Sequence, residues 1–198
     1  METIKNLEIQ NARSKGILFE GEEQIKSSSK ITILDINPSM LNVGKERAKA
    51  KGYLDENASV HIPMNFMTAD AHHLPYPDNS FDAYTIAFGI RNCTDVPKVV
   101  AEAHRVLKKG GRFLCLEFSH VNTIGIKEFY DFYSFNVIPP MGALVANDWN
   151  SYQYLVESIR QFPSVEAFAD IIHSAGFSSV SYKTFNFGIV AVHSGFKL

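Results

Sequence analysis

The stretch that decides the fold runs from Asp78 to Ser119 and reads DNSFDAYTIAFGIRNCTDVPKVVAEAHRVLKKGGRFLCLEFS. Its first part, Phe81 to Phe88, is an apolar run of strand length, rich in β-branched and aromatic residues. A helix is predicted next, capped by Asp95, with apolar residues at helical spacing and a stop at Gly110-Gly111. Phe113 to Phe118 is again a continuous apolar strand. Two such strands joined by a helix predict a βαβ unit and an α/β protein with a parallel, doubly covered sheet.

The ends of these two strands carry the first candidate site. Ligands of such sheets bind beyond the carboxyl ends of the strands, where this sequence has Gly89, Arg91 and Asn92, and Glu117 after the next strand. The alternative is a solvated loop at an ordinary helix entry, and we prefer that alternative for Asp95. For Arg91 and Asn92 we favour a site, because a glycine lets the loop pass close to a ligand.

Two further strands are expected earlier in the chain. Ile31 to Leu34 is a short apolar strand that ends at Asp35, and a helix follows that opens with Pro38 and ends near Gly52. An acidic residue in this place binds a ribose in doubly wound folds, but spacing alone favours a helix cap equally. Pro63 to Thr68 predicts another strand, which leads into the segment ADAHHLP.

The rest of the chain after Ser119 is predicted to be mostly helical, with a strand pair at the end. Phe129, Phe132, Tyr133 and Asn136 fall on one helical face, which we interpret as core or lid packing, and Val137 to Ala146 is the most apolar irregular stretch. We expect helices over Ser151–Gln161 and Ser164–Ala175, each opened by a serine cap, and strands over Phe177–Thr184 and Gly188–Phe196.

Composition excludes several classes of protein. The 198 residues carry a formal net charge of −2 without a basic stripe, which argues against a nucleic-acid partner. No apolar run is long enough to span a bilayer. Cys93 and Cys115 lack metal-ligand spacing and a disulfide-rich setting, so reduced thiols are expected. His72 and His73 are adjacent without a third ligand, so we predict surface residues and no metal site.

Four segments give the chain a family resemblance. FDAYTIAFGIRN (81–92), AEAHRVLKKGGRFLCLEFS (101–119), YDFYSFNVIP (130–139) and DWNSYQYLVESIRQFP (148–163) are similar to the ubiquinone/menaquinone C-methyltransferase family. The resemblance covers about Ile31 to Leu198. HRVLKKGG alone is shared by many class I methyltransferases, whereas FGIRN together with SYQYLVESI is more specific. The DW and RQFP details resemble the mitochondrial ubiquinone branch.

The resemblance implies a class I fold, with a mostly parallel sheet and one antiparallel strand, that depends on S-adenosylmethionine. It places Asp35 on the ribose of this cofactor, the Asp70 carboxylate near the adenine amino group, and the Ala71 amide near a ring nitrogen. The implied reaction methylates a ring carbon of a polyprenyl benzoquinol in ubiquinone biosynthesis. Arg91 would then stabilise phenolate charge, and Asn92 would orient the quinol or a water.

The resemblance also implies a location and partners. Family members suggest the matrix side of the mitochondrial inner membrane, peripheral membrane contact, other ubiquinone-biosynthesis proteins as partners, and a homo-oligomer as one option. The apolar stretch from Val137 to Ala146 would serve as a lid over the polyprenyl substrate. The first thirty residues mix Glu with Lys and do not resemble a mitochondrial transit peptide.

One part of the family pattern is not found. The family has a strand and a glycine-rich D-x-x-x-G-x-G loop ahead of the ribose acid, and no residues before Asp35 match it. We therefore expect residues 1–30 to be a polar, flexible segment and residues 31–198 to be a partial, N-terminally incomplete methyltransferase domain. This gap supports an alternative function, a non-catalytic methyltransferase-like subunit that binds quinol or partners. A nicotinamide-dependent oxidoreductase is disfavoured, since no G-x-G-x-x-G opens a helix after a strand.

Overall fold

The structure is a computed structural model that describes residues 25–26, 29–55, 60–120, 133, 136–146 and 148–198. These residues fall into two compact units, one within residues 25–33 and Asn37–Met67, the other in Leu34–Ile36 and Thr68–Leu198. The predictions for residues 1–24 and for Phe129 and Phe132 lie outside the described residues.

The first unit is built on two paired strands. Strand β2 (Ile31–Asp35) pairs with β4 (Met64–Thr68), and the two-residue strands β1 (Ile25–Lys26) and β3 (Val60–His61) pair in parallel. The N–H of Ile31 donates to the carbonyl of Pro63 at 3.0 Å, and the N–H of Ala69 donates to that of Asp35 at 3.1 Å. The first hydrogen bond joins the beginnings of the two strands and the second joins their ends, so β2 and β4 run parallel.

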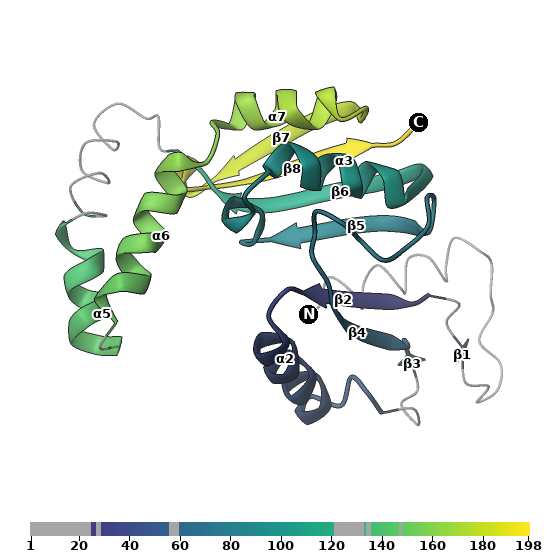
Figure 1. Ribbon diagram of the computed structural model, residues 1–198, viewed down its shortest axis with the longest axis horizontal. Helices are drawn as coiled ribbons and strands as arrows, with labels where there is room; N and C mark the ends of the chain where they lie inside the picture. The colour runs from purple at the N-terminus through teal and green to yellow at the C-terminus, as the bar shows by residue number, and fades with distance from the viewer. Residues whose placement is uncertain (1–24, 27–28, 56–59, 121–132, 134–135, 147) are drawn as a thin grey trace. The chain divides into compact units, whose positions relative to one another are not determined.

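The second unit contains the predicted βαβ unit (Figure 1). Its sheet has the order β5-β6-β8-β7, formed by β5 (Phe81–Ala87), β6 (Leu107–Phe118), β7 (Ser178–Phe185) and β8 (Val190–Phe196). Strand β5 is parallel to β6, with helix α3 (Val96–Val106) between them in sequence. Strand β8 runs antiparallel to both β6 and β7, which confirms the predicted terminal strand pair.

One face of this sheet is covered by α3 and by α7 (Val165–Ser174), which lie on the same side in Figure 1. Successive side chains of a strand alternate between faces, so Phe113, Cys115 and Glu117 of β6 all point into the covered face. Phe113 is fully buried, with ring centroids 5.8 Å from Tyr84 and 5.2 Å from Phe177. The same alternation that buries Phe113 therefore buries a carboxylate at Glu117.

The loop before β5 is fixed to α3 by hydrogen bonds between the backbone of Leu74 and two charged side chains of the helix. The N–H of Leu74 donates to Oε1 of Glu102 at 2.7 Å, and Arg105 donates both to the Leu74 carbonyl at 3.2 Å and to Glu102. The Arg105 hydrogen bonds hold the pKa of Glu102 below its usual value. Both backbone groups of Leu74 are thus satisfied, and the segment containing Asp70 and Ala71 is held against the helix.

Two sequence predictions for the helices after Ser119 need correction. Val137–Ala146 is not irregular, because Ile138–Ala146 forms helix α5; its prolines lie in the first turn, where helical N–H groups have no partner to lose. Helix α6 (Trp149–Gln161) starts before Ser151, because Asp148 is its cap and accepts from the Ser151 N–H at 3.0 Å. The Ser164 cap of α7 is confirmed, with the N–H of Ala167 donating at 3.2 Å.

The predicted helix stop at Gly110-Gly111 is wrong, because α3 ends at Val106 and both glycines lie within β6. Gly111 generates a stability prediction. A Cβ on Gly111 would lie 2.7 Å from the carbonyl oxygen of Lys108. Gly111→Ala should therefore lower the free energy of unfolding by about 1–3 kcal/mol. Gly44→Ala, whose Cβ meets nothing within 4 Å in helix α2 (Pro38–Ala50), should raise it by about 0.5–1 kcal/mol. Urea unfolding measures both, and equal effects of the two substitutions would contradict the packing argument.

Candidate active site

The loop after β5 carries Arg91 and Asn92 in a 3-10 turn, Ile90–Asn92. Ile90 is fully buried and anchors this turn in the core. Phe88 has a φ of 53°, in the left-handed region that residues with a side chain seldom adopt. Gly89 has a φ of −124°, and a Cβ there would come no closer than 3.7 Å to another atom. The reversal of the chain therefore depends on the conformation of Phe88. It does not depend on Gly89, from which we predicted a close approach of the loop to a ligand.

Arg91 forms an ion pair with Glu117 from the end of β6. Nη1 of Arg91 lies 2.8 Å from Oε1 of Glu117, and the two side chains are only 9% and 2% exposed. The backbone N–H of Phe118 also donates to Oε1 at 2.8 Å, and the N–H of Arg91 donates to Oε2 at 3.4 Å. A buried carboxylate is costly unless it is paired and hydrogen-bonded, and Glu117 meets both conditions.

The guanidinium of Arg91 has further partners. Nη1 also donates to the Phe88 carbonyl at 2.9 Å, and Nε donates to Oγ of Ser158 on α6 at 3.3 Å. The guanidinium carbon lies 5.4 Å from the centroid of the Phe118 ring. Among the described residues, the hydrogen bonds of the Arg91 guanidinium use Nε and Nη1, which leaves the N–H groups of Nη2 for another acceptor.

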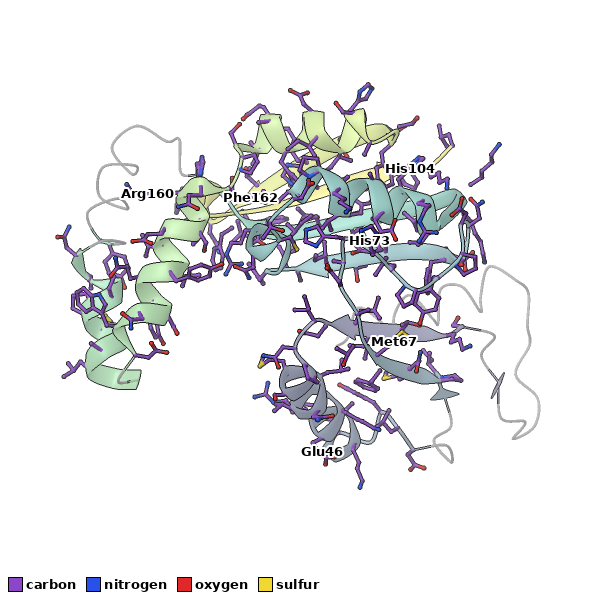
Figure 2. The ribbon with its side chains drawn as sticks, viewed as in Figure 1. Glu46, Met67, His73, His104, Arg160 and Phe162 are labelled. Carbon is purple, nitrogen blue, oxygen red and sulfur yellow. The ribbon has the colours of Figure 1, made fainter. Side chains whose placement is uncertain are left out.

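Asn92 is the exposed member of the predicted pair. Its Oδ1 accepts a hydrogen bond from the hydroxyl of Tyr154 at 3.1 Å. Tyr154 and Ser158 lie one turn apart on α6, so a single helix face contacts both Arg91 and Asn92. Phe162, labelled in Figure 2, follows this helix and packs into the core, which fixes the helix to the second unit.

Asp70 and Ala71 lie at the start of the loop that precedes β5. Oδ1 of Asp70 accepts from the backbone N–H of His72 at 2.9 Å and lies 2.6 Å from Nδ1 of its imidazole. These two hydrogen bonds, the backbone one foremost, hold the pKa of Asp70 below its usual value. An anionic Asp70 keeps an acceptor oxygen for a donor group of a ligand.

Asp35 ends β2 with an exposed side chain. The two interpretations of this residue, ribose ligand and helix cap, can now be compared. The N-cap of α2 is Asn37, whose Oδ1 accepts from the N–H of Ser39 at 2.9 Å and of Met40 at 3.4 Å. Asp35 is therefore not the cap of this helix, which removes one of the two explanations for an acidic residue here.

Asp95, for which we preferred the helix-cap interpretation, is the cap of α3. Its Oδ1 accepts from the N–H of Lys98 at 3.0 Å. Sequence reasoning missed the parts that Tyr154, Ser158 and His72 take in the site. The first two stood in the SYQYLVESI segment at a spacing of four residues, which was the one available signal.

Among the residues that the structure describes, no group of three His, Cys, Asp or Glu side chains is placed to hold a metal ion. Within this same part of the chain, no helix has both the length and the apolar character needed to cross a membrane.

Solved structures define the class of this fold. A SAM-dependent methyltransferase from Thermotoga maritima has a TM-score of 0.56 at 17% identity, over 93% of this chain and 85% of that chain. PigF with SAH has a TM-score of 0.53 at 16% identity, over 85% and 48% of the two chains. The [4+2]-cyclase SpnF has a TM-score of 0.60 at 16% identity, over 88% and 68%. The fold is that of the class I methyltransferases, as predicted, and SpnF shows that it also hosts other chemistry.

The sequence then identifies the family. Residues 10–197 match the model of the ubiE/COQ5 methyltransferase family, so the chain belongs to this family. It is 58% identical to the mitochondrial 2-methoxy-6-polyprenyl-1,4-benzoquinol methylase of Drosophila melanogaster, over 86% of this chain and 56% of the relative. It is 53% identical to the human protein of that name, over 91% and 53%. The chain thus spans about half the length of the curated relatives it matches.

The buried ion pair generates a prediction for this site. Glu117→Gln keeps the shape of the side chain but leaves the Arg91 charge buried without its partner, so the free energy of unfolding should fall by about 3 kcal/mol. Glu157→Gln, an exposed position on α6, should change it by less than about 0.5 kcal/mol. Urea unfolding at pH 7 compares the two. An effect of Glu117→Gln as small as that of the control would mean that the pair is not a stabilising contact.

Proposed function

We propose that this chain provides the catalytic part of a methyltransferase that methylates a ring carbon of a polyprenyl benzoquinol in ubiquinone biosynthesis. The family supports this proposal, as does the name shared by the Drosophila and human relatives. The structural observation that carries it is the buried Arg91–Glu117 pair, which holds the exposed Asn92 at the carboxyl ends of β5 and β6. This edge is where open α/β sheets bind their ligands.

The proposed cofactor is S-adenosylmethionine, and residues of this chain suit three of its groups. The exposed Asp35 carboxylate would accept hydrogen bonds from the ribose hydroxyls. Asp70 would accept from the adenine amino group with the oxygen that His72 does not use, and the Ala71 amide would donate to a ring nitrogen. When bound, S-adenosylmethionine supplies an electrophilic methyl group.

The ring carbon of a quinol becomes a good nucleophile only when a neighbouring hydroxyl loses its proton, so the site has to stabilise phenolate charge. Because Glu117 balances the charge of Arg91, we propose that Arg91 acts mainly through hydrogen bonds donated by Nη2 to the phenolate oxygen. Asn92 would orient the quinol or the water that accepts the proton, with Tyr154 fixing its amide. Both residues are proposed as catalytic.

Location and partners follow from the same proposal. The curated relatives are named mitochondrial, and we propose the matrix side of the inner membrane, peripheral contact with that membrane and other ubiquinone-biosynthesis proteins as partners. A homo-oligomer is compatible with this arrangement. Residues 31–198 are proposed to be the methyltransferase domain.

A non-catalytic role is the second candidate. The observation that favours it is that this fold also occurs in the [4+2]-cyclase SpnF, so the fold by itself does not establish methyl transfer. Such a chain would bind quinol or partner proteins without transferring a methyl group.

Asn92→Ala tests the catalytic proposal without disturbing the core, because Asn92 is exposed. We expect the single-turnover rate of methyl transfer to a short-tailed quinol analogue to fall on the order of 100-fold. The affinity for S-adenosylhomocysteine, measured by isothermal titration, should stay within about two-fold, since no cofactor contact is removed. Asn150→Ala, exposed on α6, is the matched control and should change neither quantity.

The same assay separates the two candidate functions. It is run on this chain and on this chain joined to the N-terminal portion of the Drosophila relative. Methyl transfer by either form supports the enzyme. Absence of methyl transfer from both forms, with S-adenosylhomocysteine still bound, would contradict the enzyme and support the non-catalytic subunit.

A further inference from the structure

His72 is not the surface residue that the sequence suggested. Its side chain is only 15% exposed, and both of its ring nitrogens have partners. Nδ1 lies 2.6 Å from Oδ1 of Asp70, and Nε2 lies 3.2 Å from the backbone nitrogen of Asp95 and 3.4 Å from Oγ1 of Thr94. Its neighbour His73, labelled in Figure 2, is exposed and contacts Nζ of Lys98 at 2.8 Å.

The partners of His72 fix the position of its proton. A backbone N–H can only donate, so Nε2 has to accept from Asp95 and carries no proton. The carboxylate of Asp70 is an acceptor, so the proton resides on Nδ1 and is donated to Asp70. These two hydrogen bonds therefore select the Nδ1–H tautomer of the ring.

The two partners belong to different parts of the site. Asp70 begins the loop before β5, for which we proposed cofactor contacts. Asp95 caps α3 and lies three residues after Asn92, the last residue of the Arg91–Asn92 turn. One rigid ring thus spans the two segments, at positions separated by more than twenty residues of sequence. We infer that His72 is a positioning residue that couples the cofactor-contacting carboxylate of Asp70 to the loop that presents Arg91 and Asn92. This inference rests on the proposed function for the identity of the two segments.

The geometry of the ring suggests two variants that each keep half of the link. In His72→Asn the side-chain amide reaches the position of Nδ1, so it can still donate to Asp70 but cannot reach Asp95. In His72→Gln the longer side chain can place its oxygen near the position of Nε2, so it can accept from Asp95 and leaves Asp70 without its side-chain donor. His72→Phe keeps a ring of similar size and removes both hydrogen bonds.

The first readout needs no ligand. Heteronuclear NMR of the unliganded chain at pH 7 should show His72 in the Nδ1–H tautomer. Hydrogen exchange of the Asp95 amide should speed up by about five- to ten-fold in His72→Asn and His72→Phe, and should stay near the parent value in His72→Gln. His73→Gln is the matched control and should leave this exchange rate unchanged.

The second readout is affinity for S-adenosylhomocysteine by isothermal titration, in whichever form of the chain binds it. His72→Gln and His72→Phe should weaken binding by about five-fold, because Asp70 loses a hydrogen bond that orients it, and His72→Asn should retain the parent affinity. The turnover rate should follow the opposite order, with His72→Asn slower than His72→Gln.

Each result bears on a separate claim. The Nε2–H tautomer, or an Asp95 exchange rate that is the same in all four variants, would overturn the positioning role of His72. If the tautomer and the exchange rates are as expected but no form of the chain binds S-adenosylhomocysteine, the cofactor proposal fails while the link between the two segments stands. Equal losses of affinity in His72→Asn and His72→Gln would also overturn the claim that cofactor affinity depends on the hydrogen bond to Asp70 and not on the one from Asp95.

Discussion

The buried ion pair between Arg91 and Glu117 is the interaction on which the candidate site depends. Two charges have been taken out of water, and each would be costly alone. The pair is possible only because Glu117 falls on the covered face of β6 and because the chain reverses at Phe88, in a left-handed conformation, to bring Arg91 back. The ionic contact therefore links the end of one strand to the loop after its neighbour, and it sets the position of Asn92.

The elements around this pair add geometric precision. Ser158 of α6 accepts from Nε of Arg91, and Tyr154 of the same helix donates to Asn92. The planar guanidinium matches this arrangement better than a lysine would, since it directs several N–H groups at fixed angles. A site of this kind holds its exposed groups rigidly at the sheet edge, which is what transfer chemistry requires of positioning residues.

The βαβ unit was predictable because its determinants are local. Two apolar strands and a capped amphipathic helix lie within forty-odd residues. The rule that ligands bind at the carboxyl ends of parallel strands then singled out Arg91, Asn92 and Glu117. The end of the helix was predicted too late, because Gly110-Gly111 lie within β6. The single antiparallel strand was implied by the family resemblance, and the structure confirms it at β8. The order of the strands was not predicted.

What sequence reasoning missed depends on contacts between distant residues. Nothing near Tyr154 indicates that its hydroxyl meets Asn92, sixty-two residues earlier. His72 was taken for a surface residue, because its partners Asp70 and Asp95 converge only when the loop folds against α3. The error at α5 had a local cause, since its two prolines suggested an irregular segment although a first helical turn accepts them.

The most direct test of this account is a double-mutant cycle on Arg91 and Glu117. Arg91→Met and Glu117→Leu are made singly and together, and the free energy of unfolding is measured in urea for all four proteins. Each single change leaves a buried charge, so we predict that the double variant loses less stability than the sum of the singles, by at least about 2 kcal/mol. Additive losses would contradict the claim that this pair organises the site.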